Sequence, residues 1–95
     1  AASDEFWQPY SAQEFEAVRQ EAQNQGRLVF IDFTAEWCLT CQVNERVTFR
    51  NQGVRDFIRQ NNVLMLKADW TRRDPGITAH LKKFGRAGVP FYLLY

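Results

Sequence analysis

The sequence has little cysteine and histidine, no surplus of charge and no long apolar run. Two cysteines and a single histidine, His80, are too few for the usual four-ligand zinc site, and a disulfide-stapled scaffold would carry more cysteines. We therefore expect His80 to be a surface or packing residue. A formal net charge of +1 gives no reason to expect nucleic acid or a membrane surface as a partner. No apolar segment approaches the roughly 20 residues that span a bilayer. Residues 1–5 lack the basic and apolar regions of a signal peptide, so if the protein is exported, its signal has been removed or lies outside this chain.

What the sequence does contain is the composition of one globular domain. Its 95 residues are 45% hydrophobic and 24% charged, which provides for one core and a polar surface. We find no repeats, low-complexity segments or internal linkers. We expect residues 1–10 to form an irregular N-terminal arm and residues 11–95 to form the folded domain.

Three short runs rich in apolar residues and β formers predict strands at 28–34, 63–69 and 91–95. The first is almost continuously apolar, as in a strand buried on both faces of a parallel sheet, and the single acid Asp32 interrupts it. Helical patterns separate the strands. This alternation predicts an α/β domain with a mostly parallel central sheet.

Local signals predict four helices. Ser11 and Glu14 have the spacing of a capping box, and the helix after them would end at Gly26. Asp74 followed by Pro75 is typical of a helix start. The predicted helices run from 11 to about 25, 38 to about 48, 51 to 60 and 74 to 84, and the residues expected to face inward on the last two are Val54, Phe57, Ile58, Ile77, Leu81 and Phe84.

Both cysteines lie in the motif Trp37-Cys38-Leu39-Thr40-Cys41, after the first predicted strand and at the start of a helix. A buried inert disulfide, or two packing thiols, is one interpretation of the pair. A redox pair is favoured, because Cys-x-x-Cys near a βαβ pattern is typical of thiol–disulfide chemistry. Functional groups of open α/β sheets also gather at the carboxyl ends of strands.

The spacing of the pair suits an exchange reaction. A helix that opens at Cys38 directs its free N–H groups and its dipole at that sulfur, which stabilises a thiolate there. Exchange proceeds by thiolate attack on a disulfide sulfur, so we expect Cys38 to attack first and the less exposed Cys41 to resolve the mixed disulfide. The reaction needs no metal and no cofactor.

The segment from Phe30 to Cys41, FIDFTAEWCLTC, resembles the active-site signature of thioredoxins. The stretches Leu39–Glu45, Ala68–Thr71 and Gly85–Pro90 resemble, more specifically, the C-terminal periplasmic domain of the DsbD family of thiol:disulfide interchange proteins. The resemblance covers about Trp7 to Tyr95. It implies a thioredoxin fold, with a central mixed or parallel sheet flanked by helices, and the activity of a protein-disulfide reductase.

The resemblance also implies roles for residues near the cysteines. Asp32 matches the buried acid of the thioredoxin strand, which tunes the charge on the sulfurs and moves protons to and from the resolving thiol; an ordinary buried polar residue is the alternative. Glu45 matches a family acid that also tunes the cysteines, although a solvated helix acid is common. Pro90 matches a proline that thioredoxins hold in cis, presenting the Val89 backbone to a bound peptide, and a plain turn proline is the alternative. Trp37 would shield the motif and contact partners.

In the DsbD family this domain takes electrons from a membrane-embedded thiol domain and passes them to an N-terminal periplasmic domain. The resemblance therefore implies protein thiols and disulfides as partners, and a periplasmic location as a soluble domain of an inner-membrane protein. Two alternatives stay open. One is a free-standing thioredoxin-like reductase or oxidant, and the other is a docking module that does not use its cysteines.

The chain departs from the thioredoxin pattern in two places. Leu39-Thr40 replaces Gly-Pro between the cysteines, so a thioredoxin redox potential cannot be carried over. The chain also stops at Tyr95, and we expect the last strand and helix of the thioredoxin fold to be missing from it. Arg72 and Arg73 are expected to be a solvated loop pair, with contact to a partner domain as the alternative.

Overall fold

The computed structural model describes residues 6–95, so half of the expected N-terminal arm, residues 1–5, lies outside the described part. The elements are β1 (Trp7–Pro9), α1 (Phe15–Asn24), β2 (Val29–Thr34), α2 (Leu39–Val47), α3 (Gln52–Gln60), β3 (Leu64–Asp69), α4 (Pro75–Lys83) and β4 (Phe91–Leu94). Helices separate successive strands throughout, with two of them, α2 and α3, between β2 and β3, which confirms the predicted α/β class.

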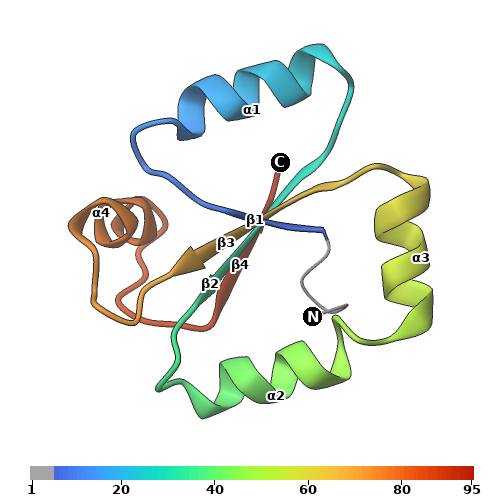
Figure 1. The fold of residues 1–95 in the computed structure, drawn as a ribbon. Helices are drawn as coiled ribbons and strands as arrows, with labels where there is room; N and C mark the ends of the chain where they lie inside the picture. Colours follow the sequence, from blue (N-terminus) through green and yellow to red (C-terminus); the bar gives the residue numbers. More distant parts are fainter. Residues whose placement is uncertain (1–5) are drawn as a thin grey trace.

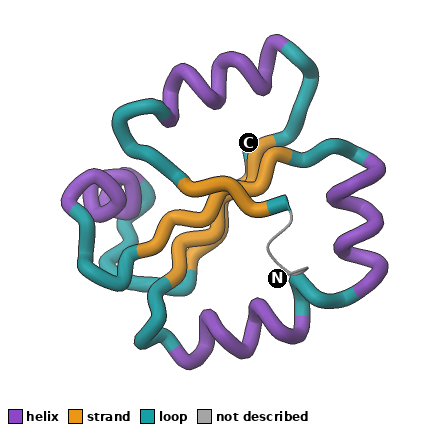
Figure 2. Tube along the Cα trace, in the orientation of Figure 1, coloured by secondary structure: helices purple, strands orange, loops and turns teal. Residues whose placement is uncertain are grey.

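The strands form one mixed sheet in the order β1-β3-β2-β4. β2 lies between β3, to which it is parallel, and β4, to which it is antiparallel, and β1 is parallel to β3. Figure 2 shows the strands crossing the middle of the molecule with the helices arranged around them. Helices α2 and α3 form the crossover between β2 and β3. The cysteine motif lies where this crossover begins, between the end of β2 and the start of α2.

The helices cover both faces of the sheet, with α1 and α4 on one face and α2 and α3 on the other (Figure 1). Side chains of β2 alternate between these faces. Val29, Ile31 and Phe33 pack in the cluster that contains buried residues of α1 and α4, whereas Phe30 packs in the cluster that contains Ile58 of α3. By the same alternation, Asp32 lies on the face of the sheet that Phe30 occupies, the face covered by α2 and α3.

Residues 7–9, which we expected to be part of an irregular arm, form β1 instead. Trp7 pairs with Met65 and Pro9 pairs with Lys67 along the edge of β3. Proline is tolerated in such an edge strand because one side of the strand needs no ladder hydrogen bond. A strand of three residues carries almost no periodicity, so its formation depends on the edge that β3 offers.

The predicted capping box does not form, and α1 begins at Phe15 with Glu14 as an N-cap that makes no side-chain cap. The backbone N–H of Glu14 donates to the carbonyl of Ser11 at 3.2 Å. In a capping box the side chain of Ser11 would accept a hydrogen bond from the backbone N–H of Glu14, but here the backbone carbonyl of Ser11 accepts it. At the other end of the helix, Gly26 has the left-handed φ of 67° expected of a residue just past a helix.

Two aromatic residues expected in the core are exposed instead. Phe57 on α3 is 56% exposed and Phe84, just after α4, is 44% exposed. Phe57 lines an apolar hollow of about 520 Å³ between α2, α3 and β4, and Phe84 stacks its ring on His80 at 5.9 Å. The other residues expected to face inward are buried or half-buried, namely Val54, Ile58, Ile77 and Leu81.

Candidate redox site

Cys38 and Cys41 form a disulfide at the start of α2, with their Cα atoms 5.2 Å apart. Cys38 is the N-cap of the helix, and its Sγ accepts a hydrogen bond from the backbone N–H of Cys41 at 3.1 Å. The side chain of Cys38 is the more exposed of the two, since the residues are 7% and 2% exposed. The geometry therefore places the first sulfur where free helix N–H groups stabilise a thiolate, as the spacing predicted.

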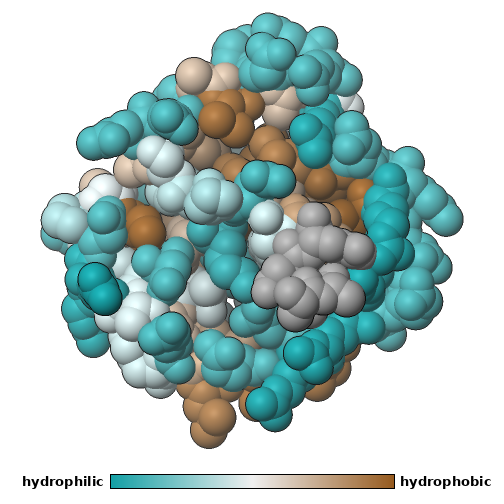
Figure 3. All heavy atoms as spheres, viewed as in Figure 1, coloured by the Kyte–Doolittle hydropathy of each residue, from teal (hydrophilic) through white to brown (hydrophobic). Residues whose placement is uncertain are grey.

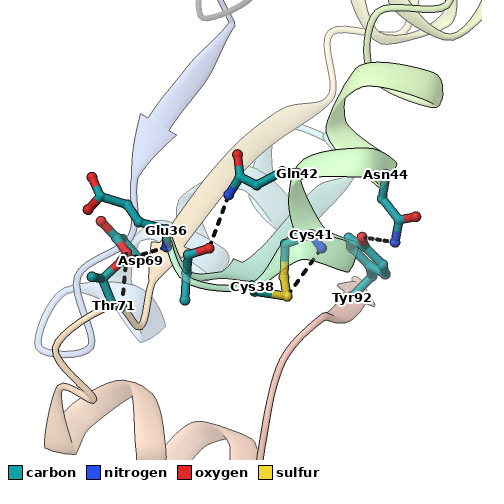
Figure 4. The surroundings of a disulfide bond; sticks show 9 residues. Glu36, Cys38, Cys41, Gln42, Asn44, Asp69, Thr71 and Tyr92 are labelled. Carbon is teal, nitrogen blue, oxygen red and sulfur yellow. Dashed lines mark hydrogen bonds between the residues drawn. A yellow bond between two sulfur atoms is a disulfide. The ribbon is translucent and has the colours of Figure 1, made fainter.

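The loop between β2 and α2 fixes the disulfide to the end of the central strand. The backbone N–H of Cys38 donates to the carbonyl of Ala35 at 3.1 Å, and Nε2 of Gln42 donates to the same carbonyl at 3.0 Å. Gln42 thus ties the first turn of α2 back to the loop. Figure 4 shows the disulfide in this setting, with Glu36, Asp69 and Thr71 on one side of it and Asn44 and Tyr92 on the other.

Asp32 lies in the sheet beneath α2 and is only 2% exposed. Its direct cross-strand neighbours are Lys67 on β3 and Tyr92 on β4. Both neighbours bond to α2: Nζ of Lys67 lies 2.7 Å from Oε1 of Glu45, and the hydroxyl of Tyr92 accepts a hydrogen bond from Asn44 at 2.9 Å. The strand acid is therefore enclosed by the helix that carries Cys41 and by two polar strand residues.

Burial raises the pKa of Asp32 from 3.8 to about 7, the negative charge of Glu45 adds to the rise, and the positive charge of Lys67 opposes it. The pKa of Tyr92 is also raised, first by burial and then by the charges of Asp32 and Glu45, while the hydrogen bond from Asn44 opposes the rise. The carboxyl group of Asp32 thus exchanges its proton near neutral pH, which is the property required of a general acid or base.

The residues expected on the far side of the disulfide lie in the loop before β4. The Val89–Pro90 peptide bond is cis, as predicted. The half-buried side chain of Val89 packs against the cluster of Ala35, Cys38 and Cys41. The structure therefore brings Val89 to the cysteine pair, while the role of Pro90 in binding a peptide stays a prediction.

Trp37 stands at the rim of the site, 50% exposed. Its Nε1 donates to the carbonyl of Thr71 at 2.9 Å, and the backbone N–H of Glu36 donates to Oγ1 of the same threonine at 2.9 Å. The hydroxyl and the backbone N–H of Thr71 donate in turn to Asp69 at the end of β3. These bonds join the loop before the cysteines to the turn after β3.

Exposed apolar side chains continue from the rim along the outer face of α2. Leu39, Val43 and Val47 recur every four residues, and they are 79%, 50% and 68% exposed. Figure 3 shows hydrophobic atoms at the lower margin of the molecule, where Figure 1 places α2.

His80 lies outside this site, in the core formed by α1, α4 and the opposite face of the sheet. It is 6% exposed, with Nδ1 2.7 Å from the hydroxyl of Tyr10 and Nε2 3.2 Å from the hydroxyl of Tyr95. Packing, one of the two expected roles, is thus confirmed. Among residues 6–95, no three His, Cys, Asp or Glu side chains are grouped so as to hold a metal ion, and no helix is long and apolar enough to cross a membrane.

Sequence reasoning did not identify three polar residues around the site. Lys67 is a charged residue within an apolar strand, as Asp32 is, and this similarity could have indicated that the two side chains lie near each other. Tyr92 and Asn44 gave no signal, because their hydrogen bond depends on how α2 crosses β4.

Comparison with known proteins agrees with this geometry. Residues 8–95 match the family model described as thioredoxin-like, and the chain belongs to this family.

Within the family, the chain is similar to thiol:disulfide interchange protein DsbD. It is 39% identical over 80 residues to the protein of Ralstonia nicotianae and 36% identical over 74 residues to that of Yersinia pestis. These segments cover 84% and 78% of this chain but only 13% and 12% of the relatives, so the chain spans about an eighth of their length.

Solved structures show the same fold. The oxidised C-terminal domain of Neisseria meningitidis DsbD superposes with a TM-score of 0.73 at 23% identity, covering 88% of this chain and 72% of that one. A thioredoxin from Thermus thermophilus superposes with a TM-score of 0.69 at 23% identity, covering 93% of this chain and 62% of that one. Fold, family and disulfide together support thiol–disulfide oxidoreductase activity.

Proposed function

We propose that this chain is a protein-disulfide reductase that relays electrons from a membrane-embedded thiol domain to periplasmic protein partners. The observation that carries the proposal is the disulfide at the N-terminus of α2, with Sγ of Cys38 already accepting a helix N–H. The likeness to DsbD over most of the chain supports the relay and the periplasmic location.

The reaction runs in two exchange steps. In the reduced protein the Cys38 thiolate attacks one sulfur of the partner's disulfide; that bond breaks, a mixed disulfide forms, and one partner thiol leaves. Cys41 then loses its proton and attacks the sulfur of Cys38, which releases the second partner thiol and closes the Cys38–Cys41 disulfide. Two electrons pass from the cysteine pair to the partner.

In this mechanism Asp32 and Glu45 control charge and protons. Cys41 is 2% exposed, so its proton needs an acceptor within the protein. Asp32, buried beneath the same helix and with a pKa of about 7, is the group we assign to accept it. Glu45 acts on Asp32 through its charge, and Lys67 balances that charge through the ion pair at 2.7 Å.

We assign the docking surface to Trp37, Val89 and Pro90. Trp37 directly precedes Cys38 in the chain, and Val89 packs against the cluster that contains Cys38. The exposed apolar residues that continue along α2 favour a protein over a small molecule as the substrate.

The test is insulin reduction with dithiothreitol as the electron source, followed by light scattering. We expect catalysis by the wild-type chain and none by Cys38→Ala. In addition, Cys41→Ala that has been reduced and then freed of dithiothreitol should accumulate a mixed disulfide with an insulin chain on a non-reducing gel, whereas Cys38→Ala treated in the same way should accumulate none.

The matched control is Asp56→Asn, which removes an exposed carboxylate on α3 and should leave the rate unchanged. A docking module would give a wild-type rate no higher than that of Cys38→Ala. An oxidant would be distinguished by its equilibrium with glutathione, because it would stay reduced in a buffer that oxidises thioredoxin.

A further inference from the structure

One arginine covers two tryptophans at the rim of the redox site. The guanidinium carbon of Arg73 lies 4.9 Å from the ring centroid of Trp37 and 4.9 Å from that of Trp70. The two ring centroids are themselves 6.0 Å apart, so a single cation contacts both rings. Because Trp37 directly precedes Cys38, this cation stands next to the surface on which a partner's disulfide must dock.

The backbone holds Arg73 in this position. Its N–H donates to the carbonyl of Trp70 at 2.9 Å, and its φ is 53°, in the left-handed region that residues other than glycine seldom adopt. The same turn is fixed to the active-site loop through the hydrogen bonds of Thr71 described above. The side chain of Arg73 is therefore presented by a built turn and not by a free loop.

Arg73 has no ion-pair partner within the part of the chain that the structure describes. Among residues 6–95, no carboxylate forms an ion pair with it. The acids that flank the turn have other partners, since Asp69 accepts hydrogen bonds from Thr71 and Asp74 caps α4. Within residues 6–95 the guanidinium group of Arg73 donates no side-chain hydrogen bond, so its N–H donors are available to a partner.

We propose that Arg73 recognises a carboxylate of the partner, so that the preferred partner is a protein with an acidic side chain close to its disulfide. A guanidinium edge binds a carboxylate through two parallel N–H···O bonds, and the two tryptophans restrict it to one orientation. The inference rests on the proposed function, because it names the chemistry of the partner that the cysteine pair reduces.

The test compares disulfide probes of different charge. Reduced protein is mixed with glutathione disulfide, which carries carboxylates, with bis(2-hydroxyethyl) disulfide, which is neutral, or with cystamine, which is cationic. Acid quenching, alkylation and mass measurement give the rate constant of oxidation for each probe. We expect Arg73→Gln to lower the ratio of the glutathione disulfide rate to the neutral rate by about two- to fivefold, the range of an exposed ion pair. The ratio of the cystamine rate to the neutral rate should not fall.

Arg72→Gln is the matched control, because it removes the same charge from the adjacent exposed position. Arg72→Gln should lower the ratio of the glutathione disulfide rate to the neutral rate by less than half as much as Arg73→Gln does. Arg73→Lys keeps the charge without the planar fork and should give an intermediate ratio.

Three results would overturn the assignment: an unchanged ratio in Arg73→Gln, an equal effect of Arg72→Gln, or an equal loss of rate with all three probes, which would indicate a packing role. A wild-type protein that none of the probes oxidises would instead contradict the proposed function, and the inference with it.

Discussion

The protonation of Asp32 should make the stability of this protein depend strongly on pH. Burial beneath α2, reinforced by the charge of Glu45, raises the pKa of Asp32 from 3.8 to about 7. In the unfolded chain the carboxyl group returns to its ordinary pKa. Because each pH unit is worth about 1.4 kcal/mol, ionising this group costs about 4 kcal/mol more in the folded protein than in the unfolded chain.

The sign follows from proton binding. Between pH 4 and 7 the folded protein keeps the proton on Asp32 while the unfolded chain has lost it, so stability falls as the pH rises. Asparagine at this position has nearly the same shape and does not titrate. The free energy of unfolding of Asp32→Asn minus that of the wild type should therefore increase by about 4 kcal/mol between pH 4 and pH 8.

The measurement is urea unfolding of both oxidised proteins at one-unit steps of pH, followed by tryptophan fluorescence. Taking the difference between the proteins removes the contributions of other titrating groups that the substitution leaves alone. Asp56→Asn, at an exposed position on α3, is the control and should differ from the wild type by under about 1 kcal/mol at every pH. If the difference for Asp32→Asn stays constant within about 1 kcal/mol from pH 4 to 8, the buried carboxyl group does not behave as argued here.

Three other outcomes follow from the structure. Lys67→Met should move the midpoint of the Asp32-dependent loss of stability to higher pH, because the charge of Lys67 lowers the pKa of Asp32, and an unmoved midpoint in the same urea series would contradict this. In the reduced protein Cys38 should react with iodoacetamide at least severalfold faster than Cys41, because it begins the helix and is the more exposed, and equal rates on timed mass mapping would refute the assignment. Burial lowers the pKa of His80, so the folded protein binds this proton less readily than the unfolded chain and stability should fall as the pH drops below about 6.5. His80→Gln should lack this part of the pH dependence, and parallel stability curves for the two proteins would show that His80 does not cause it.

The features predictable from the sequence are those that neighbouring residues determine. Asp74 followed by Pro75 marks the start of α4, and the structure shows Asp74 accepting hydrogen bonds from the first free N–H groups of that helix. The position of Cys38 at the opening of α2 is equally local, since a strand ends just before it and a helix begins just after it. In both cases the hydrogen bonds lie within one turn of the residues that predict them.

The features that the sequence did not reveal depend on contacts between distant segments. Trp7 joins the sheet only because β3 has an unpaired edge, and Lys67 meets Glu45 only because α2 crosses that strand. The covering of Trp37 by Arg73 depends on the turn after β3 folding back onto the active-site loop. Separations of more than 20 residues in each pair leave no periodic signal in a single sequence.

The unusual pKa of Asp32 also bears on the order of the two exchange steps. In the mechanism proposed above, a thiolate at Cys38 would oppose ionisation of the buried Asp32, which would then stay protonated and add no charge that opposes the attack. When Cys38 forms the mixed disulfide, its charge is lost, and ionisation of Asp32 becomes easier. An ionised Asp32 is the form that can accept the proton of Cys41, which has to leave at that stage and not before. A carboxyl group with an ordinary pKa would be ionised throughout and would oppose the first step, whereas one raised well above 7 would not accept the proton in the second. A pKa of about 7, which Asp32 has in the oxidised protein, would therefore suit the role that we propose for it in both steps.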